Sequence, residues 1–420
     1  MRRHGEWRRD SGEVSSEVSS EVSSEVSSEV SSEVSSEVSS EVSEEESVMR
    51  HVDLGTVSRP MSQAVYHGVA HTMGAGDEPT LITVSPDGPY VCVGYHQVAA
   101  REVNRDYCVA HDIPVARRMV GGGAVLLDHD QVFWHLVLPR GAEPVQVVYD
   151  RCLGAPVDAY RRMGIAAEHR PVNDIVVGAQ KIGGTGAVTL EGALAIVGSL
   201  MFDFDVDTMT QVLVVPSEKF RDKMLTSLRE YMTTMRAQLG SAMPSRREAV
   251  ALLVEAFGEH LGEPVHRSSL TPEEAAASSH YAELLFDPAF VYAYGSTEGW
   301  VQAGVKIREG VRLYEGVAKA PGGLVRIIVR ERDGRVDDVL LAGDFLVDPR
   351  DGLARVAEQL VGCELLPEAY LPRLESAWAT VTVPGVTAAD VGRAWAQAVA
   401  IDPTEVLESH RATGEARAGP

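Results

Sequence analysis

Cysteine and long apolar runs are scarce in this 420-residue chain. Its four cysteines show neither the CxxC spacing nor the neighbouring histidines of a zinc site, and we expect them to be reduced, buried residues: Cys92, Cys108, Cys152 and Cys363. No stretch approaches the roughly 18 apolar residues that cross a bilayer, and the charged, Ser-rich start lacks the apolar centre of a secretory signal. We therefore expect a soluble, cytoplasmic protein that does not use a membrane.

Basic residues are also in short supply. The chain has 38 Lys and Arg against 61 Asp and Glu, which gives a formal charge of -23. Phosphate is repelled by such a field unless basic residues are strongly segregated, so a general nucleic-acid-binding role is excluded.

The N-terminal segment is a repeat. From Glu13 the tetrapeptide Glu-Val-Ser-Ser occurs seven times, and residues 1–50 hold 13 acidic and five basic side chains. One small apolar residue in four cannot offset the entropy of ordering the chain. We predict that residues 1–48 are disordered, with an acidic docking arm as the alternative and Met49 as a second possible start.

Beyond Met49 the pattern mixes helices and strands without regular βα alternation, which predicts an α+β fold. Within the helical pattern at 217–239, residues 220–239 carry apolar side chains at helical spacing, among them Tyr231, and we interpret them as core filling. The expected helices are 62–73, 101–111, 217–239, 245–261 and 271–285, and the expected strands are 79–84, 90–94, 124–127, 132–138, 174–177 and 194–200.

A second, smaller α+β domain is expected near the C-terminus. Strands at 324–330 and 336–342 flank Asp333-Gly334, a strong hairpin signal, and helices are expected at 352–361, 367–377 and 388–399. The predicted division is a tail at 1–48, a catalytic domain at 49–300, an accessory domain at 301–410 and a flexible end at 411–420.

Two motifs could carry chemistry. The first, Arg117-Arg118-Met119-Val120-Gly121-Gly122-Gly123-Ala124-Val125, offers exposed backbone N–H groups beside two arginines that could hold an anion. The second runs from Asn173-Asp174 into a short hairpin whose return strand begins at Lys181 and continues through Gly183-Gly184-Thr185-Gly186. A surface turn and a solvated hairpin lysine are the alternatives that each motif leaves open by itself.

Together the two motifs resemble the lipoate-protein ligase A family, within the biotin and lipoate ligase superfamily. Family members carry Arg-Arg-x-x-Gly-Gly-Gly-Ala-Val and a later Asn-Asp hairpin that leads to Lys-x-x-Gly, in the same order. Weaker resemblances extend the likeness from Met49 to about His410 and include segments 94–97, 216–223, 319–324 and 343–345. The resemblance implies a mixed or antiparallel sheet flanked by helices, followed by an accessory domain.

The resemblance also implies an activity. Lipoate or octanoate would be activated by ATP and Mg²⁺ as an acyl-adenylate and passed to a lysine of a lipoyl-acceptor domain, such as a 2-oxoacid dehydrogenase E2 or the glycine-cleavage H protein. Lys181 would be catalytic, and Asp174 would also hold the metal. The positions implied to bind substrate or adenylate are Arg118, Gly121, Gly122, Gly123, Ala124, Asn173, Asp174, Gly184 and Gly198. Movement of the accessory domain would require a hinge near residues 299–309.

The sequence departs from the family at one conspicuous place. Many members have a His pair before the glycine that corresponds to Gly198, whereas this chain has Ile196-Val197. Related octanoyltransferases use a nucleophilic cysteine just before the hairpin, but residues 166–170 contain none, and the surroundings of Cys152 do not match. ATP-independent acyl transfer, a non-catalytic lipoate-binding relative and biotin ligation remain the alternatives.

Overall fold

The structure is a computed structural model that describes residues 48–215, 217–295 and 311–400. The tail predicted at 1–48 lies outside the described residues except for its last position, and the domain boundary near residue 300, the hinge at 299–309 and the end at 411–420 lie outside them entirely. None of the helices in the described ranges is long and apolar enough to cross a bilayer.

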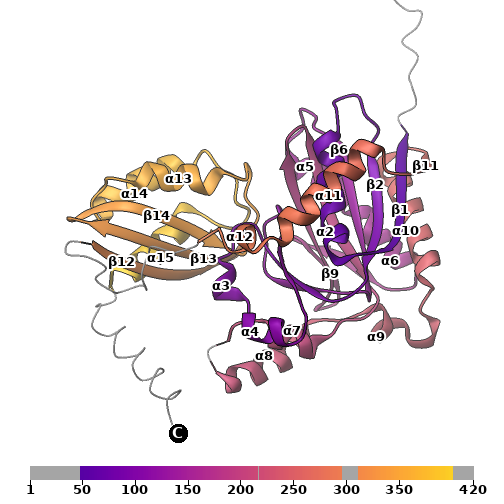
Figure 1. The fold of residues 1–420 in the computed structure, drawn as a ribbon, viewed down its shortest axis with the longest axis horizontal. Coiled ribbons are helices and arrows are strands. Elements are labelled where there is room, and N and C mark those ends of the chain that lie inside the picture. Colours follow the sequence, from indigo (N-terminus) through magenta and orange to yellow (C-terminus); the bar gives the residue numbers. More distant parts are fainter. Residues whose placement is uncertain (1–47, 216, 296–310, 401–420) are drawn as a thin grey trace, which may run out of the picture. The chain divides into compact units, whose positions relative to one another are not determined.

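A mixed sheet of eight strands forms the centre of the part from Met49 to Val291 (Figure 1). Strand β1 pairs in parallel with both of its neighbours, and every other pairing in this sheet is antiparallel. In spatial order the strands are β11 (Val265–Ser268), β1 (Met49–Val57), β2 (Thr80–Pro86), β6 (Gln131–Pro139), β10 (Ala193–Met201), β9 (Gln180–Leu190), β8 (Asp174–Val177) and β7 (Ala167–Arg170). The predicted α+β class with a mixed sheet is confirmed.

Helices cover both faces of this sheet because its strands bury side chains on both sides. On β6, Trp134 and Leu136 belong to the core beneath α5 (Val145–Cys152), α6 (Gly154–Arg162) and α10 (Arg246–Leu261). Phe133 and Val137 belong to the opposite core, beneath α2 (Arg59–Thr72) and α11 (Pro272–Phe286). The two faces are called here the α10 face and the α2 face.

A small sheet carries the triple-glycine segment. Its strands are β4 (Val115–Arg117), β3 (Tyr90–Val93) and β5 (Val125–Leu127), and the glycines lie between β4 and β5. The strands predicted at 79–84 and 90–94 both exist, but β2 belongs to the large sheet and β3 to the small one. The Pro-Asp-Gly turn between them therefore joins two sheets.

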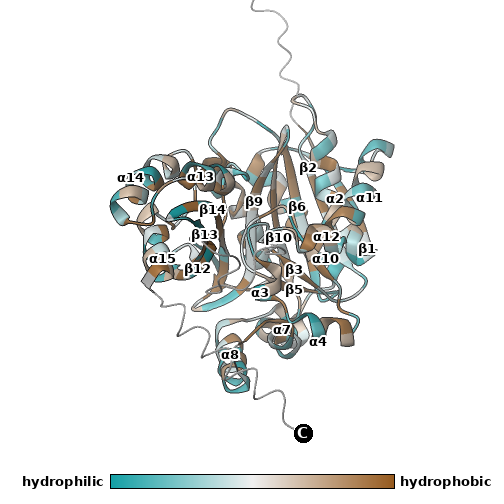
Figure 2. Ribbon diagram, turned by 60° about the vertical axis from the view of Figure 1, so that its left-hand side comes forward, coloured by the Kyte–Doolittle hydropathy of each residue, from teal (hydrophilic) through white to brown (hydrophobic). Residues whose placement is uncertain are grey.

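The C-terminal part has a hydrophobic core of its own. Strands β12 (Val311–Ala320), β13 (Gly323–Arg332) and β14 (Arg335–Gly343) form an antiparallel sheet packed by α13 (Gly352–Leu360), α14 (Pro367–Trp378) and α15 (Ala388–Ala400). The predicted hairpin turn is present, with positive φ at Asp333 and Gly334. The hydropathy colours along α14 change between brown and teal, in keeping with a helix that buries one side (Figure 2).

Two predicted helices are each broken into two. The first becomes α3 (Ala99–Glu102) and α4 (Arg105–Ala110), because the Asn104 side chain accepts a hydrogen bond from the Tyr107 N–H and starts a new helix. The second becomes α8 (Glu218–Tyr231) and α9 (Met235–Leu239), where Thr234 caps α9 in the same way.

The core-filling role predicted for the helix at 217–239 is wrong for α8. None of its residues is buried, and its contact with the neighbouring core is made by the partly buried Leu228. Short helices α7 (Val206–Val212) and α12 (Pro288–Val291) complete the described elements.

Candidate functional site

The predicted lysine hairpin is formed by β8 and β9 and turns at Gly178, which has a φ of 58°. The Lys181 amine lies 2.7 Å from the Asp174 carboxylate, and 25% of the lysine side chain is exposed. A Cβ atom placed on Gly184 would lie 3.2 Å from that amine, so the lysine lies across a position that has no side chain. The amine is therefore held against the strand instead of extending into solvent.

A β-bulge explains how Lys181 and Gly184 share a face although they are three residues apart. The register of β8 against β9 shifts between Ile175 and Val176, so Asp174 pairs with Gly184 while Val176 pairs with Lys181. Bulges redirect side chains in this way and are common beside functional sites.

Asp174 is the centre of an ionic cluster. Its second carboxylate oxygen accepts hydrogen bonds from the Arg170 guanidinium at 2.7 Å and from the Tyr231 hydroxyl at 2.9 Å. Arg170 also donates to the Tyr231 oxygen at 2.6 Å. Burial alone would raise the pKa of Asp174, but Lys181, Arg170 and Tyr231 together outweigh it and hold the pKa below its usual value.

Neither Arg170 nor Tyr231 was among the predicted site residues. Tyr231 lies in the helix that was predicted to fill the core, whereas the structure places it at the exposed end of α8 with its hydroxyl on Asp174. The chain that follows it runs beside the lysine strand, where the Thr233 N–H donates to the Lys181 carbonyl at 2.8 Å. A contact between residues 57 positions apart leaves no local signal in the sequence.

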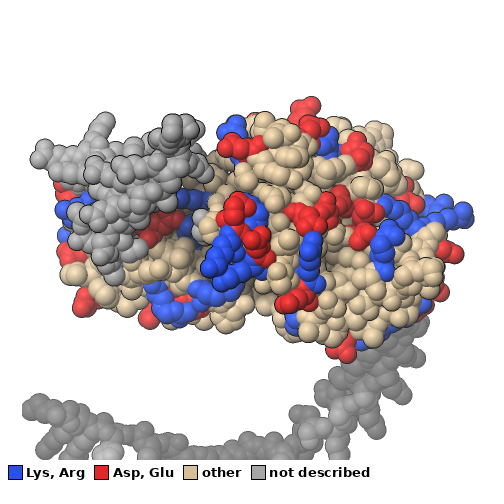
Figure 3. Space-filling view, turned by 90° about the horizontal axis from the view of Figure 1, so that it is seen from below, with Lys and Arg blue, Asp and Glu red and all other residues tan. Residues whose placement is uncertain are grey.

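Charges of both signs lie side by side on the surface around α8 (Figure 3). Arg229 on this helix pairs with Asp207 at 2.8 Å, and Arg236 pairs with Asp203 at 2.6 Å. Such alternation does not create a field of one sign on this face.

Asn173 holds the two ends of the hairpin together. Its side-chain amide donates to the Thr185 carbonyl at 3.1 Å, and its own carbonyl accepts from the Thr185 N–H at 2.9 Å. The Thr185 hydroxyl also contacts the Tyr149 hydroxyl of α5 at 2.5 Å. These contacts give Asn173 a positioning role, and its predicted contact with a nucleotide stays a prediction.

The Arg118 side chain bridges the triple-glycine turn by hydrogen bonds to its backbone carbonyls. The guanidinium donates to the carbonyls of Gly121 and Gly123, both at 2.8 Å, and to the Cys92 carbonyl at 3.0 Å. Gly122 has a φ of 95°, which favours glycine. Arg118 thus shapes the turn, and its predicted contact with the substrate or adenylate stays a prediction.

Arg117, the neighbouring arginine, is buried. Its guanidinium donates to four carbonyls, those of Gly94, Tyr95, Gln97 and Val291. Burial lowers its pKa to about 10, so it stays charged at neutral pH. The idea that this arginine holds a ligand anion is wrong, because its donors are used to join distant segments of the chain.

The glycine turn also meets the C-terminal part. The Gly122 N–H donates to the Phe345 carbonyl at 3.1 Å, and a Cβ atom on Gly121 would lie 2.3 Å from that oxygen. Close by, the His96 imidazole contacts the Arg350 carbonyl at 2.9 Å. Glycine at position 121 is therefore required by a close approach of backbone to backbone.

The remaining predicted positions lie on strands. Ala124 is half-buried and packs beside β5, and Gly198 pairs with Thr185 on β9. A Cβ atom on Gly198 would lie 2.3 Å from the Trp134 ring, so core packing explains this glycine. The predicted ligand contacts of Ala124 and Gly198 stay predictions.

Strand β9 connects the two predicted motifs. The glycine at 186, two residues beyond Gly184 and on the same face, would meet Val120 at 2.8 Å if it carried a Cβ atom. Val120 directly precedes the glycine turn. The lysine hairpin and the turn thus border one sheet face, separated by five residues of β9, or roughly 16 Å of strand.

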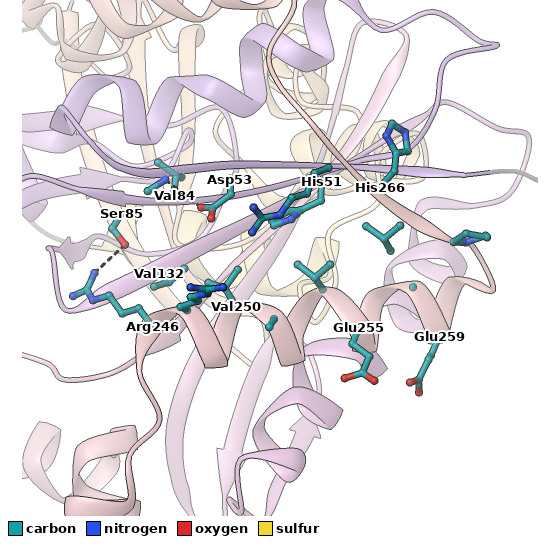
Figure 4. Close-up of a pocket in the computed structure, with 18 of the residues that line it drawn as sticks. His51, Asp53, Val84, Ser85, Val132, Arg246, Val250, Glu255, Glu259 and His266 are labelled. Carbon is teal, nitrogen blue, oxygen red and sulfur yellow. Dashed lines mark hydrogen bonds between the residues drawn. The ribbon is translucent and has the colours of Figure 1, made fainter.

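A hollow of about 1020 Å³ lies elsewhere, between β1 and α10 on the α10 face. Figure 4 shows Arg246 reaching Ser85, a contact of 3.1 Å, with His51 and Asp53 nearby. None of the predicted site residues lines this hollow.

The four cysteines are free and buried, as predicted. Cys152 is completely buried, and burial raises the pKa of its thiol to about 11. A thiol that is protonated and inaccessible is a poor nucleophile.

Comparisons with known proteins identify the family of this chain. Residues 61–258 match the family model of the lipoyl protein ligase A/B catalytic domain. The chain is 30% identical to lipoate-protein ligase A subunit 1 of Thermoplasma acidophilum, over 57% of this chain and 90% of that relative. It is 25% identical to octanoyltransferase LipM of Brevibacillus brevis, over 54% of this chain and 92% of that relative.

Solved structures give the same answer for the fold. A bipartite lipoate protein ligase from Thermoplasma acidophilum, described with its E2 lipoyl domain, matches at a TM-score of 0.55 and 27% identity, covering 59% of this chain and 97% of that one. LipL1 of P. falciparum in complex with lipoate matches at 0.61 and 15% identity, covering 83% and 99%, which shows the fold alone.

The mixed sheet with helices on both faces is the catalytic fold of lipoate ligases. Because the chain covers nearly all of a relative with 30% identity, it belongs to the lipoate-protein ligase family.

Proposed function

We propose that this protein activates lipoate or octanoate with ATP and transfers the acyl group to a lysine of a lipoyl-acceptor domain. The observation that carries the proposal is the Lys181 amine, held over Gly184 on the sheet face that the glycine turn also borders. Further support comes from lipoate-protein ligase A bound with ATP, a structure with a TM-score of 0.52 and 24% identity that covers 59% of this chain and 99% of that one.

The first step joins two anions. A carboxylate oxygen of the acid attacks the α-phosphorus of ATP, the bond to pyrophosphate breaks, and an acyl-adenylate forms. A fixed ammonium group such as that of Lys181 would offset the repulsion and stabilise the charge that develops on the phosphoryl oxygens.

Asp174 is the residue that we propose as a magnesium ligand. Within the described ranges no group of three His, Cys, Asp or Glu side chains could hold a metal ion by itself. Mg²⁺, however, is commonly bound by one or two carboxylates together with substrate phosphates, and when bound it would neutralise phosphate charge. Asp174 is the carboxylate beside Lys181 that could supply this contact.

The second step forms an amide. The neutral amine of the acceptor lysine attacks the acyl carbonyl, the bond to AMP breaks, and the amine loses a proton. Lys181 would again face the oxygen on which charge develops. E2 lipoyl domains are the acceptor class suggested by the Thermoplasma ligase, which was described with such a domain.

Lipoylation of a purified E2 lipoyl domain by the full chain, with ATP, Mg²⁺ and lipoate, tests the proposal by mass spectrometry. Removal of the amine in Lys181→Ala should lower acyl-adenylate formation by about 10²- to 10³-fold, the usual effect of losing one stabilising group. Unchanged pyrophosphate release in this variant would contradict the proposed role.

ATP-independent octanoyl transfer is the second candidate, because octanoyltransferases are among the relatives. It would require a reactive cysteine, and the burial of all four cysteines argues against it. Acceptor labelling from an octanoyl carrier without ATP, together with a trapped thioester, would favour this candidate over the ligase.

A further inference from the structure

The hollow between β1 and α10 has a polar wall on the side of the sheet. His51 is 4% exposed, Thr83 1% and Ser85 4%, although the same face of the sheet packs an apolar core elsewhere. Figure 4 shows His51 and Asp53 on the strand side of the hollow and Val250 on the helix side. A hollow of about 1020 Å³ with buried polar groups on one wall and apolar side chains on the other has the usual form of a small-molecule site.

A chain of hydrogen bonds fixes the polar wall. The Thr83 hydroxyl and the Gly55 N–H both donate to Asp53 Oδ1 at 3.2 Å. Because the Thr83 proton goes to Asp53, the Thr83 oxygen accepts from His51 Nε2 at 2.9 Å. Burial lowers the pKa of His51, so its ring is neutral at pH 7 and Nδ1 is an acceptor. The second Asp53 oxygen and His51 Nδ1 are thus two acceptors on one face of β1.

Two arginines line the same hollow. Arg267 is paired in register with His51 on the neighbouring strand, so the two side chains lie on the same face. Asp53 raises and Arg267 lowers the pKa of this histidine, which means that both charges lie close to its ring. On the helix, Arg247 and Val250 are three residues apart and share the face that lines the hollow. Neither guanidinium forms an ion pair with a described residue.

The other carboxylates of the hollow and Arg246 have partners or are closed off. Figure 4 shows Glu255 and Glu259 pointing away from the strands, and they pair with Arg162 at 3.4 Å and 2.5 Å. Arg246 donates to a hydroxyl of β2 at 3.1 Å. Glu263 follows the end of α10, and its Oε2 is shielded from solvent. Among the described residues, the free charges of the hollow are therefore one carboxylate and two guanidinium groups.

We propose that this hollow binds a free α-amino acid with a large apolar side chain. The α-ammonium group donates to Asp53 and to His51 Nδ1, the α-carboxylate accepts from the two arginines, and the side chain packs on the valines of α10. A fatty acid would leave Asp53 and His51 without a donor, and an alkylamine would leave both arginines without an acceptor. The site is separate from Lys181, which does not line the hollow, and the inference does not depend on the proposed function.

Equilibrium dialysis of the full chain with radiolabelled L-leucine tests the proposal, and unlabelled analogues compete for the site. 4-Methylpentanoate keeps the apolar chain and the carboxylate without the amine, and 3-methylbutylamine keeps the amine without the carboxylate. Leucine should bind at one site per chain. Each analogue should bind at least about ten-fold more weakly, because each leaves a charged group of the hollow without its partner. L-Serine should also bind more weakly, because it has no apolar side chain to bury.

Two substitutions assign the two ends of the ligand. Asp53→Asn keeps an oxygen for Thr83 and removes the charge, so the dissociation constant of leucine should rise about ten-fold while that of 4-methylpentanoate stays within about two-fold. Arg267→Gln should weaken the binding of both. Arg140→Gln is the matched control, because this exposed arginine does not line the hollow, and it should leave both constants unchanged. Thermal unfolding of each variant shows that it is folded.

The unmodified chain alone can overturn the proposal. Failure of leucine to saturate one site would do so, as would displacement of leucine by either analogue as readily as by unlabelled leucine. Unchanged leucine binding in folded Arg267→Gln would overturn it as well. Lys181→Ala should bind leucine like the unmodified chain, and lost binding in that variant would place the amino acid at the site of the proposed function instead.

Discussion

Asp174→Asn isolates the charge at the centre of the ionic cluster while preserving the shape of the side chain. In the structure the carboxylate accepts from Lys181 and Arg170, each at 2.7 Å, and from Tyr231 at 2.9 Å. A neutral amide can accept from one cation with its oxygen, but its NH₂ group then faces the other. The substitution should therefore release the lysine amine and lower the rate of acyl-adenylate formation by about 10- to 100-fold, less than removal of the amine itself.

The stability cost follows from partial burial. The side chains of Asp174 and Lys181 are 18% and 25% exposed. Exposed pairs are worth about 0–1 kcal/mol, and removal of one partner from a fully buried pair costs about 3–5 kcal/mol. An intermediate value of about 2 kcal/mol corresponds to a fall in Tm of roughly 3 °C in a protein of this size.

The pH dependence has a defined sign. Because the folded pKa of Asp174 is below its usual value of 3.8, the stabilisation is present above that value and is lost as the pH falls through the folded pKa. The difference in unfolding free energy between the unmodified chain and Asp174→Asn should thus stay constant from about pH 8 to pH 5 and shrink below about pH 4. Urea unfolding at a series of pH values measures it.

A matched control is Asp207→Asn, which removes an exposed carboxylate that pairs with Arg229 at 2.8 Å. Its effect should stay within about 0.5 kcal/mol at every pH. A stability difference for Asp174→Asn that grows on acidification, or pyrophosphate release equal to that of the unmodified chain, would refute the reasoning.

Three further substitutions probe other features. Gly121→Ala should lower the free energy of unfolding by about 1–3 kcal/mol, because the new Cβ would lie 2.3 Å from the Phe345 carbonyl oxygen. It should also weaken the hydrogen-exchange protection of the segment around Phe345, and unchanged protection would contradict this. Gly198→Ala should cost a similar amount, about 1–3 kcal/mol in urea unfolding, through a clash with the Trp134 ring, and a neutral result would show that the core adjusts. Cys152→Ala should leave ligase activity within about two-fold, since the thiol is buried and protonated, and loss of acyl transfer in a folded variant would revive the thioester route.

Local sequence patterns predicted the elements whose structure is set locally. The Asp333-Gly334 turn and the hairpin that presents Lys181 depend on neighbouring residues, and both were found where expected. The helix at 101–111 was wrong in detail because a capping residue, Asn104, lies inside an otherwise helical pattern.

Features set by distant contacts could not be predicted. The apolar spacing of α8 indicated a core helix, but spacing alone does not say whether another element covers the helix. The same is true of Arg117 and Arg118, whose donors go to carbonyls that only the folded chain brings near, and of the Tyr231 hydroxyl on Asp174.

The buried guanidinium of Arg117 bears on how the protein can be divided. The family match ends at residue 258, yet two of the donor nitrogens of this arginine bind the carbonyl of Val291. In a fragment cut at the end of the match, the buried guanidinium of Arg117 would lose the Val291 carbonyl as a hydrogen-bond acceptor. The fragment would also lack α11, which covers α2, and β11, which pairs with the edge of β1. The smallest piece that should be expressed for independent study therefore extends from Met49 at least to Val291.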